Sequence, residues 1–441
     1  MTTMAHRAPV LQTLFTTTAE AVAARTGFVE RRSTMTGTAF AHTLVFGWLA
    51  NPHASLDAVA HTAAAVGVCV RPQGLDQRVH EGAAVFMEDL LAAALTTVGA
   101  TTPVAVPILQ RFTAVAILDS STLVLPDVLA PYWPGCGGTT THNTAAALKI
   151  GVRLDLCSGA LAGPTLVDGR THDAASPLQR APLPAGALRL ADLGFFDLDV
   201  FAQLQTHGVW WLSRLHDKTT VCDTQGRPLG VLALLAAQDA ATLDLPIRLG
   251  APHQLPARLL AVRVPEEVAN ERRHRLRVDA QRHGRTPSAA RRAWCDGTLL
   301  VTNTPPALFS LHEALVLARA RWQIEVLFQL WKSQGVIDAS RSRTPWRILC
   351  EIFATVLAML VPQWLLLCSA WAVPDRSLVT ASHTVRQDAV ALASALRSPL
   401  LLDHRLAVLA HCLGTGCRLN PRKKKPNTIP LLRDPSLLSL A

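Results

Sequence analysis

The segment from residue 318 to residue 332 limits the fold most, because it favours a helix with one charged side and one apolar side. At about 100° per residue, Arg321, Glu325 and Lys332 fall within about 40° of one another, and Phe328 joins the same stripe. The opposite side consists of Trp322, Val326, Leu327 and Leu330. Such a helix can bury its apolar side and present the charged stripe to an anionic ligand. The alternative is a solvated helix whose Arg/Glu pair contributes only a few tenths of a kcal/mol.

Two apolar segments lead into aspartates. Residues 115–118 are rich in β-branched side chains and precede Asp119, while residues 188–191 precede Asp192 and then Gly194. A buried strand that delivers a carboxylate to a sheet edge has this pattern. Each segment is weak alone, since aspartate commonly ends strands. The order of two strand aspartates and then a helical Glu325 is more specific.

This order of residues resembles the DDE transposases of bacterial insertion sequences, of the insertion-sequence-four type with its Tyr-Arg-Glu-Lys box. The box runs Tyr, two residues, Arg, three residues, Glu, six residues, Lys. Arg321, Glu325 and Lys332 match that spacing, and Ala318 stands at the Tyr position. The resemblance covers the chain from about residue 30 to about residue 370.

The resemblance implies that Asp119, Asp192 and Glu325 are the catalytic residues and hold two Mg²⁺ ions, for which Mn²⁺ can substitute. Carboxylates are the ligands that Mg²⁺ prefers, and a pair of ions about 3.5–4 Å apart can activate an attacking hydroxyl and stabilise a leaving oxygen. Arg321 and Lys332 would then hold phosphates of the DNA end.

Three further residues are candidate DNA contacts. Arg214 and Lys218 follow a tryptophan-rich strand and could bind backbone phosphates, with plain surface charge as the equal alternative. In the resembling family a tryptophan of the insertion domain stacks on a flipped base, an interaction worth roughly 1–3 kcal/mol. Trp294 is the candidate for that role, with a position in the core as the alternative.

The charge of the chain favours a polyanionic partner. Its net charge is +10 and its pI is about 9.6, which agrees with binding to double-stranded DNA at transposon ends and target. Residues 266–292 contain eight arginines against four acids, and residues 422–425 are Arg-Lys-Lys-Lys. Either run could instead be a solvated charged surface. Phosphate contacts would make binding strongly salt-dependent.

Cysteine usage and hydropathy bear on the compartment. The nine cysteines include no Cys-x-x-Cys pair, and residues 1–7 do not begin a signal peptide, so we expect a bacterial cytoplasmic protein, associated with the nucleoid when bound to DNA. Residues 352–374 carry no charge and are long enough to span a membrane. Because Pro362 and Gln363 interrupt this segment, we predict a buried helix packed on the catalytic sheet and no membrane association.

The resemblance implies an α/β fold in which a ribonuclease-H-like mixed sheet is interrupted by a mainly β insertion and flanked by helical ends. Strands are predicted at residues 114–118, 147–156, 208–214 and 299–302. Asp192 and Glu325 are 133 residues apart, far more than one crossover requires, which predicts the insertion between them. The predicted regions are a helical DNA-binding part (1–105), the first core part (106–220), the insertion (221–298), the second core part (299–374) and a helical, basic end (375–441).

Within the first region, a helix, a turn at residues 71–74 and a second helix could put Gln77, Arg78 and His80 on DNA. A small helical bundle with a loop is the alternative, and Arg31 and Arg32 are equally ambiguous.

We therefore predict a cut-and-paste transposase that binds terminal inverted repeats and dimerises when two ends meet, and the resemblance implies that cleavage proceeds by way of a hairpin intermediate. Two rivals remain at this stage. One is a catalytically inactive DNA-binding protein derived from a transposase, for which Ala318 is the only hint. The other is a membrane-associated protein anchored by residues 352–374.

Overall fold

The chain folds as two compact units, each assembled from three stretches of sequence. The computed structural model describes residues 8–29, 34–97, 104–136, 145–237, 241–282, 284–339, 342–370, 376–419 and 426–438. The first unit comprises Met1–Val104, Ser120–Thr171 and Ile324–Asn420; the second comprises Ala105–Asp119, His172–Gln323 and Pro421–Ala441. The units cut across the five predicted regions, which stay a prediction.

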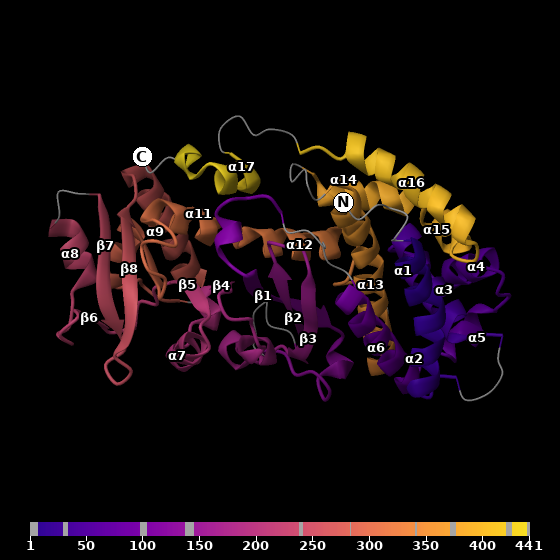
Figure 1. Ribbon diagram of the computed structural model, residues 1–441. Coiled ribbons are helices and arrows are strands. Elements are labelled where there is room, and N and C mark those ends of the chain that lie inside the picture. Colours follow the sequence, from indigo (N-terminus) through magenta and orange to yellow (C-terminus); the bar gives the residue numbers. More distant parts are fainter. Residues whose placement is uncertain are drawn as a thin grey trace. The chain divides into compact units, whose positions relative to one another are not determined.

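The first unit is mainly helical, as predicted for both ends of the chain (Figure 1). Its amino-terminal helices are α1 (Ala8–Thr13), a π-helical turn (Leu14–Thr18), α2 (Ala19–Arg25), α3 (Gly37–Ala50), α4 (Leu56–Ala65), α5 (Pro72–Asp76) and α6 (Glu81–Thr97). Its later helices are most of α12 (Trp322–Ser333), α13 (Pro345–Ala370), α14 (Leu378–Gln387), α15 (Ala389–Ala395) and α16 (Pro399–Gly416). Thr36 and Ser55 are the N-caps of α3 and α4, and each side chain accepts a hydrogen bond from a backbone N–H of its helix.

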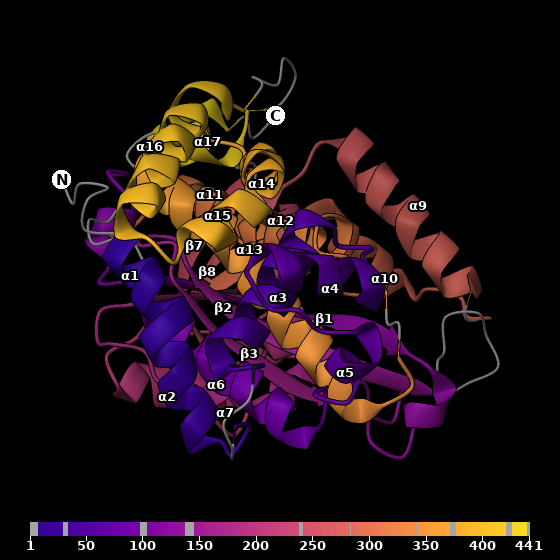
Figure 2. The same cartoon turned by 90° about the vertical axis from the view of Figure 1, so that its right-hand side faces the viewer.

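Helix α13 forms the centre of this helical unit and contains most of the predicted apolar segment (Figure 2). It is the one described helix long and apolar enough to cross a membrane, yet 89% of its apolar window is buried in the protein. Within the first unit it packs on α3, α6, α14 and α16. A helix that is apolar all round needs partners on several sides, which these helices supply. The predicted packing on the catalytic sheet stays a prediction. Residues 371–374 lie outside the described part.

The predicted helix-turn-helix is not formed. Residues 71–74, predicted as its turn, mostly belong to α5, which begins at Pro72 and ends with Gln77 as its C-cap. Proline is favoured in the first turn of a helix, which explains why the Pro-Gln-Gly sequence starts one. Arg78 and His80 therefore lie in the connection to α6 instead of on a second helix. Arg31 and Arg32 fall outside the described residues.

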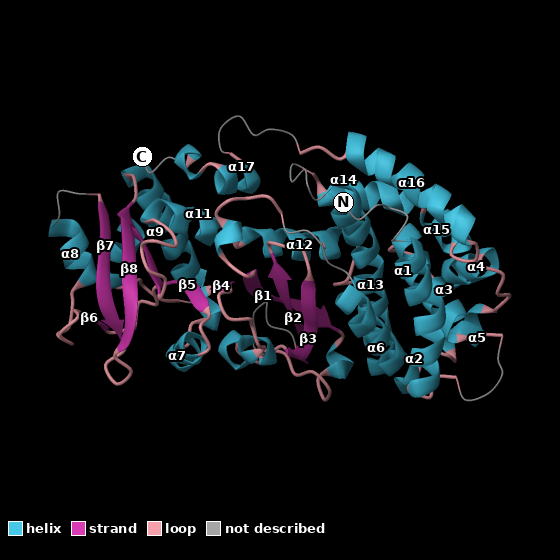
Figure 3. Ribbon diagram, viewed as in Figure 1, coloured by secondary structure: helices cyan, strands magenta, loops and turns pink. Residues whose placement is uncertain are grey.

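The second unit is built on a mixed sheet, which confirms the predicted α/β class (Figure 3). The strands, in the order of the sheet, are β1 (Val115–Leu125), β4 (Leu188–Ala191), β5 (Trp210–Arg214), β9 (Gly297–Thr302), β8 (Leu255–Arg263), β7 (Thr242–Leu249) and β6 (Val221–Cys222). The first three are parallel and the others are antiparallel. In the first unit, β2 (Ala146–Asp155) and β3 (Leu161–Asp168) form an antiparallel pair. Four predicted strands thus correspond to β1, β2, β5 and β9.

Six helices belong to the second unit in its described part: α7 (Leu198–Thr206), α8 (Val231–Ala237), α9 (Glu266–Arg282), α10 (Ala289–Ala293), α11 (Leu311–Ala320) and α17 (Thr428–Arg433). Residues 221–298, predicted as mainly β, contain α8, α9 and α10 as well as three strands. The apolar run at residues 230–235 contributes to α8. Strand β8 pairs with β9 from Arg258↔Thr302 to Arg263↔Gly297, so this region extends the sheet of the second unit.

Candidate catalytic site

Asp119 and Asp192 lie side by side on neighbouring parallel strands. Leu118 of β1 and Ala191 of β4 form the last pair in this register. Asp119 directly follows Leu118, and Asp192 directly follows Ala191. Because side chains alternate along a strand, residues in matching register project from the same face. Asp119 was predicted to follow the end of its strand, but β1 continues to Leu125. The Asp119 carboxylate therefore lies inside β1, next to the point where the neighbouring strand β4 ends.

Arg321 joins the two aspartates. Its Nη1 lies 3.3 Å from Oδ2 of Asp119, and its Nη2 lies 3.8 Å from Oδ1 of Asp192. The Asp119 side chain is 15% exposed, whereas that of Asp192 is 44% exposed. One guanidinium thus offsets the charge of only one of the two carboxylates, both contacts are rather long, and Asp192 is open to solvent. All three residues belong to the second unit.

The predicted single helix over residues 318–332 is divided at Arg321. Helix α11 ends at Ala320 and α12 begins at Trp322, with Arg321 as the C-cap of α11. Arg321 keeps α-helical backbone angles, φ −50° and ψ −32°, so the division does not explain which side of α12 is buried. Phe328, predicted on the exposed stripe, is buried at 6% exposure, and Trp322, predicted on the buried side, is 50% exposed. Helix α12 instead buries Ile324, Leu327, Phe328, Leu330 and Trp331.

Glu325 and Lys332 lie at opposite ends of α12. Glu325 is half-buried in its first turn, four residues after Arg321. Lys332 is in the last turn, where its Nζ donates to the carbonyl oxygen of Thr122 in β1 at 3.4 Å. Glu325 belongs to the first unit, and its placement with the two aspartates stays a prediction.

Asp119 and Asp192 are suitable ligands for a divalent ion. Their carboxylate oxygens are the donors that Mg²⁺ prefers, and they converge on a cationic group. Among the described residues, no three His, Cys, Asp or Glu side chains gather as a metal cluster. The aspartate pair therefore fits such an ion by donor type, and a third carboxylate is required to complete the predicted set.

A cleft of about 770 Å³ in the second unit contains several of the predicted residues. Arg214, Ala318 and Arg321 all line it. Lys218 is an exposed turn residue outside the lining, and Trp294 is half-buried against the apolar core. Because part of Trp294 stays exposed, its role as a DNA contact stays a prediction.

Sequence reasoning missed Arg189, a charged residue within the apolar β4. It is 1% exposed, donates to the side chain of Gln179 and lies 5.8 Å from the ring centroid of Phe201. Burial lowers the pKa of Arg189 to about 10. An arginine in an otherwise apolar strand was the available signal.

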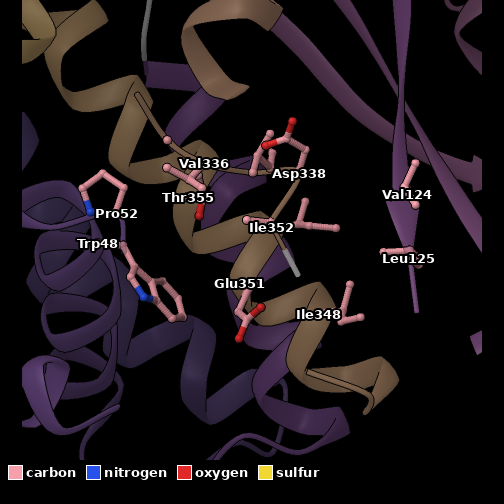
Figure 4. A pocket seen from close by; sticks show the side chains of 13 residues that line it. Trp48, Pro52, Val124, Leu125, Val336, Asp338, Ile348, Glu351, Ile352 and Thr355 are labelled. Carbon is pink, nitrogen blue, oxygen red and sulfur yellow. The ribbon is translucent and has the colours of Figure 1, made fainter. Parts of the chain in front are cut away.

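A smaller pocket in the first unit has a different character. Figure 4 shows Trp48 of α3, Glu351 and Thr355 of α13, and Val336 around it. Glu351 accepts a hydrogen bond from Arg347 at 3.1 Å, and the same arginine lies 2.6 Å from Asp76. These charges brace α5 and α13, so this pocket offers no rival catalytic arrangement.

Residues 110–361 match the family model described as Transposase DDE domain. The chain is 24% identical over 365 residues to the transposase for insertion sequence element IS231B of Bacillus thuringiensis subsp. berliner, covering 78% of this chain and 75% of the relative. It is 25% identical over 387 residues to the IS231C transposase of the same organism, covering 82% and 79%. It is also 23% identical over 310 residues to the transposase for IS1151 of Clostridium perfringens, covering 66% and 65%.

Proposed function

The chain belongs to the Transposase DDE domain family, and from this premise we propose that it moves an insertion sequence by cut-and-paste transposition. Family membership makes it a DNA-cleaving and DNA-transferring enzyme and implies dependence on a divalent metal in general. The proposal concerns how the residues of this chain carry out that activity.

Asp119, Asp192 and Glu325 are the proposed catalytic carboxylates. The observation that carries the proposal is the register of β1 and β4, which sets Asp119 beside Asp192 with Arg321 within reach of both. Glu325 follows Arg321 by four residues, about one helical turn, which supports it as the third member. The proposed cofactor is a pair of Mg²⁺ ions, replaceable by Mn²⁺, which when bound would activate the attacking hydroxyl and stabilise the leaving oxygen.

The cationic residues are proposed to position the DNA. Arg321 contacts two carboxylates and offsets the charge of one of them, and it would become available to a phosphate once another cation is bound by these carboxylates. Lys332, held by a single contact of 3.4 Å, supplies a second point charge for the backbone. Binding and alignment are thus assigned to Arg321 and Lys332, and chemistry to the carboxylates.

The wider setting follows the resemblance. We propose a ribonuclease-H-like core, recognition of terminal inverted repeats, cleavage through a hairpin intermediate and a dimer that joins two ends in the synaptic complex. The double-stranded DNA partners are the transposon ends and the target, in the bacterial cytoplasm at the nucleoid.

The test is Mg²⁺-dependent cleavage of a labelled duplex that carries the element's end, comparing wild type with Glu325→Gln. Glu81→Gln is a matched control, because Glu81 also lies in the first turn of a helix. We expect Glu325→Gln to bind the duplex without cutting it, while Glu81→Gln cuts normally. Normal cutting by Glu325→Gln would remove Glu325 from the proposed site.

A further inference from the structure

The cleft of the second unit gathers five arginines from separate parts of the sequence. They are Arg214 of β5, Arg263 of β8, Arg272 of α9, Arg319 of α11 and Arg321. Among the residues that line the cleft there is no Asp or Glu and no aromatic residue. A cavity lined by charges of one sign concentrates ions of the other sign. A polyanion therefore fits this cleft better than a neutral ligand.

Three of these arginines donate to neutral acceptors, and Arg263 does so to the carbonyl oxygen of Leu235 at 2.7 Å. Arg272 donates to the carbonyl oxygen of Gly297 at 2.9 Å and to Oγ1 of Thr298 at 3.0 Å. Arg319 donates to the carbonyl oxygen of Pro426 at 3.1 Å. These bonds fix the direction of each guanidinium without neutralising its charge. The cleft thus presents oriented cations to whatever enters it.

Arg272 and Arg214 also repel each other. Burial lowers the pKa of Arg272, and the charge of Arg214 lowers it further. Two like charges that converge in a partly buried cleft are stabilised by an anion that both can contact. A phosphate between them would relieve this repulsion.

We propose that this cleft holds the sugar-phosphate backbone of a DNA strand, with one phosphate bound between Arg214 and Arg272. The inference rests on the proposed function and deepens it, because it adds Arg263, Arg272 and Arg319 to the DNA-binding residues. Arg321 lines the cleft and contacts both aspartates, so a strand lying in the cleft leads to the carboxylates. The proposed contacts are to phosphates, which carry no sequence information directly, so we expect binding in the cleft to be independent of sequence.

The first experiment measures binding without cleavage. The full chain is titrated into a fluorescein-labelled mixed-sequence single strand of about 20 nucleotides, in EDTA, by fluorescence anisotropy at several salt concentrations. We expect Arg272→Gln to weaken binding about tenfold and to reduce the salt slope by about one. Arg275→Gln is the matched control, because it removes the same charge from the same helix outside the cleft, where Arg275 is 76% exposed.

A second pair of variants keeps the test decisive if Arg272→Gln loses its bonds to Gly297 and Thr298 and fails to fold. Ala318→Leu narrows the cleft without changing any charge, and Arg214→Gln removes the other half of the phosphate site. Weaker binding by both supports the proposal. Binding by both that matches Arg275→Gln overturns it.

The outcome also separates this inference from the proposed function. If the cleft variants bind normally while Glu325→Gln still loses Mg²⁺-dependent cutting, the cleft proposal fails and the catalytic proposal stands. If the wild type binds neither this strand nor a duplex carrying the element's end, the DNA-binding part of both proposals fails.

Discussion

Two Asp–Arg contacts on the same sheet of the second unit differ in geometry. In the antiparallel part, Arg258 binds Asp244 with two short bonds of 2.6 and 2.5 Å and donates to the carbonyl oxygen of Phe309 at 3.0 Å. In the parallel part, Arg321 reaches Asp119 and Asp192 at 3.3 and 3.8 Å.

The difference separates a structural ion pair from a binding site. The Arg258 side chain is 8% exposed and its donors are used by fixed partners, as a buried charge requires. Arg321 is shared between two carboxylates at longer distances, and the Asp192 side chain is 44% exposed. We infer that the Arg258–Asp244 pair holds β7 and β8 together, whereas the aspartates at Arg321 can exchange this arginine for a ligand.

The largest expected effect is on catalysis. Asp119→Asn should reduce Mg²⁺-dependent strand cleavage by about a thousandfold or more, because loss of a metal ligand removes several kcal/mol of charge stabilisation. The measurement is single-turnover cleavage of the labelled end. Asp244→Asn is the control from the structural pair, and it should cut at a rate near wild type. Equal losses in the two variants would erase the distinction between the contacts.

A buried histidine in the helical first unit makes the stability of the protein depend on pH. His42 donates from Nε2 to the carbonyl oxygen of Phe15 at 2.9 Å, and burial lowers its pKa to about 4. The folded state therefore binds a proton at His42 less readily than the unfolded state does. The contribution of neutral His42 to stability is fully present above about pH 6.5 and is lost as the pH falls towards 4. The loss should reach about 3 kcal/mol at the acid end.

Urea denaturation at pH 7 and pH 4.5 checks this expectation. His42→Gln should flatten the pH dependence over that interval. His80→Gln, which changes an exposed histidine, should leave it as in the wild type. An unchanged pH dependence in His42→Gln would mean that another group titrates.

A smaller effect is expected on stability at the structural pair. Asp244→Ala leaves the Arg258 charge without its carboxylate and should destabilise the protein by about 2 kcal/mol, less than for a fully buried pair because Asp244 is 39% exposed. Denaturant midpoints measure the change. Asp192→Ala, beside Arg321, should destabilise the protein much less than Asp244→Ala does and should reduce strand cleavage much more.

The smallest expected effect concerns the shape of the cation at the site. Arg321→Lys keeps the charge but loses the planar fork that reaches both aspartates, so cleavage should fall about tenfold with little change in stability. Arg258→Lys should instead lower stability and leave cleavage unaffected. Cleavage rates and urea midpoints for both variants distinguish the two roles.

Local pattern was sufficient for much of this molecule. The apolar runs before Asp119 and Asp192 predicted β1 and the strand that precedes Asp192, since side-chain alternation and burial act over a few residues. The position of Asp119 within β1 could not be predicted, because β1 continues to Leu125 and has β2, a later segment of the chain, as its other neighbour in the sheet.

By itself the sequence determined the helical ends, several of the strands, the order of the acidic residues and the basic charge, all properties of local pattern or composition; the mixed sheet was implied by the family resemblance. Tertiary structure alone decided that α13 packs on four helices of its unit, that two helices adjoin at Arg321, and that five arginines share one cleft. These features depend on contacts between residues far apart in the chain. Spacing along one segment carries no information about such contacts, since they form only when distant elements pack.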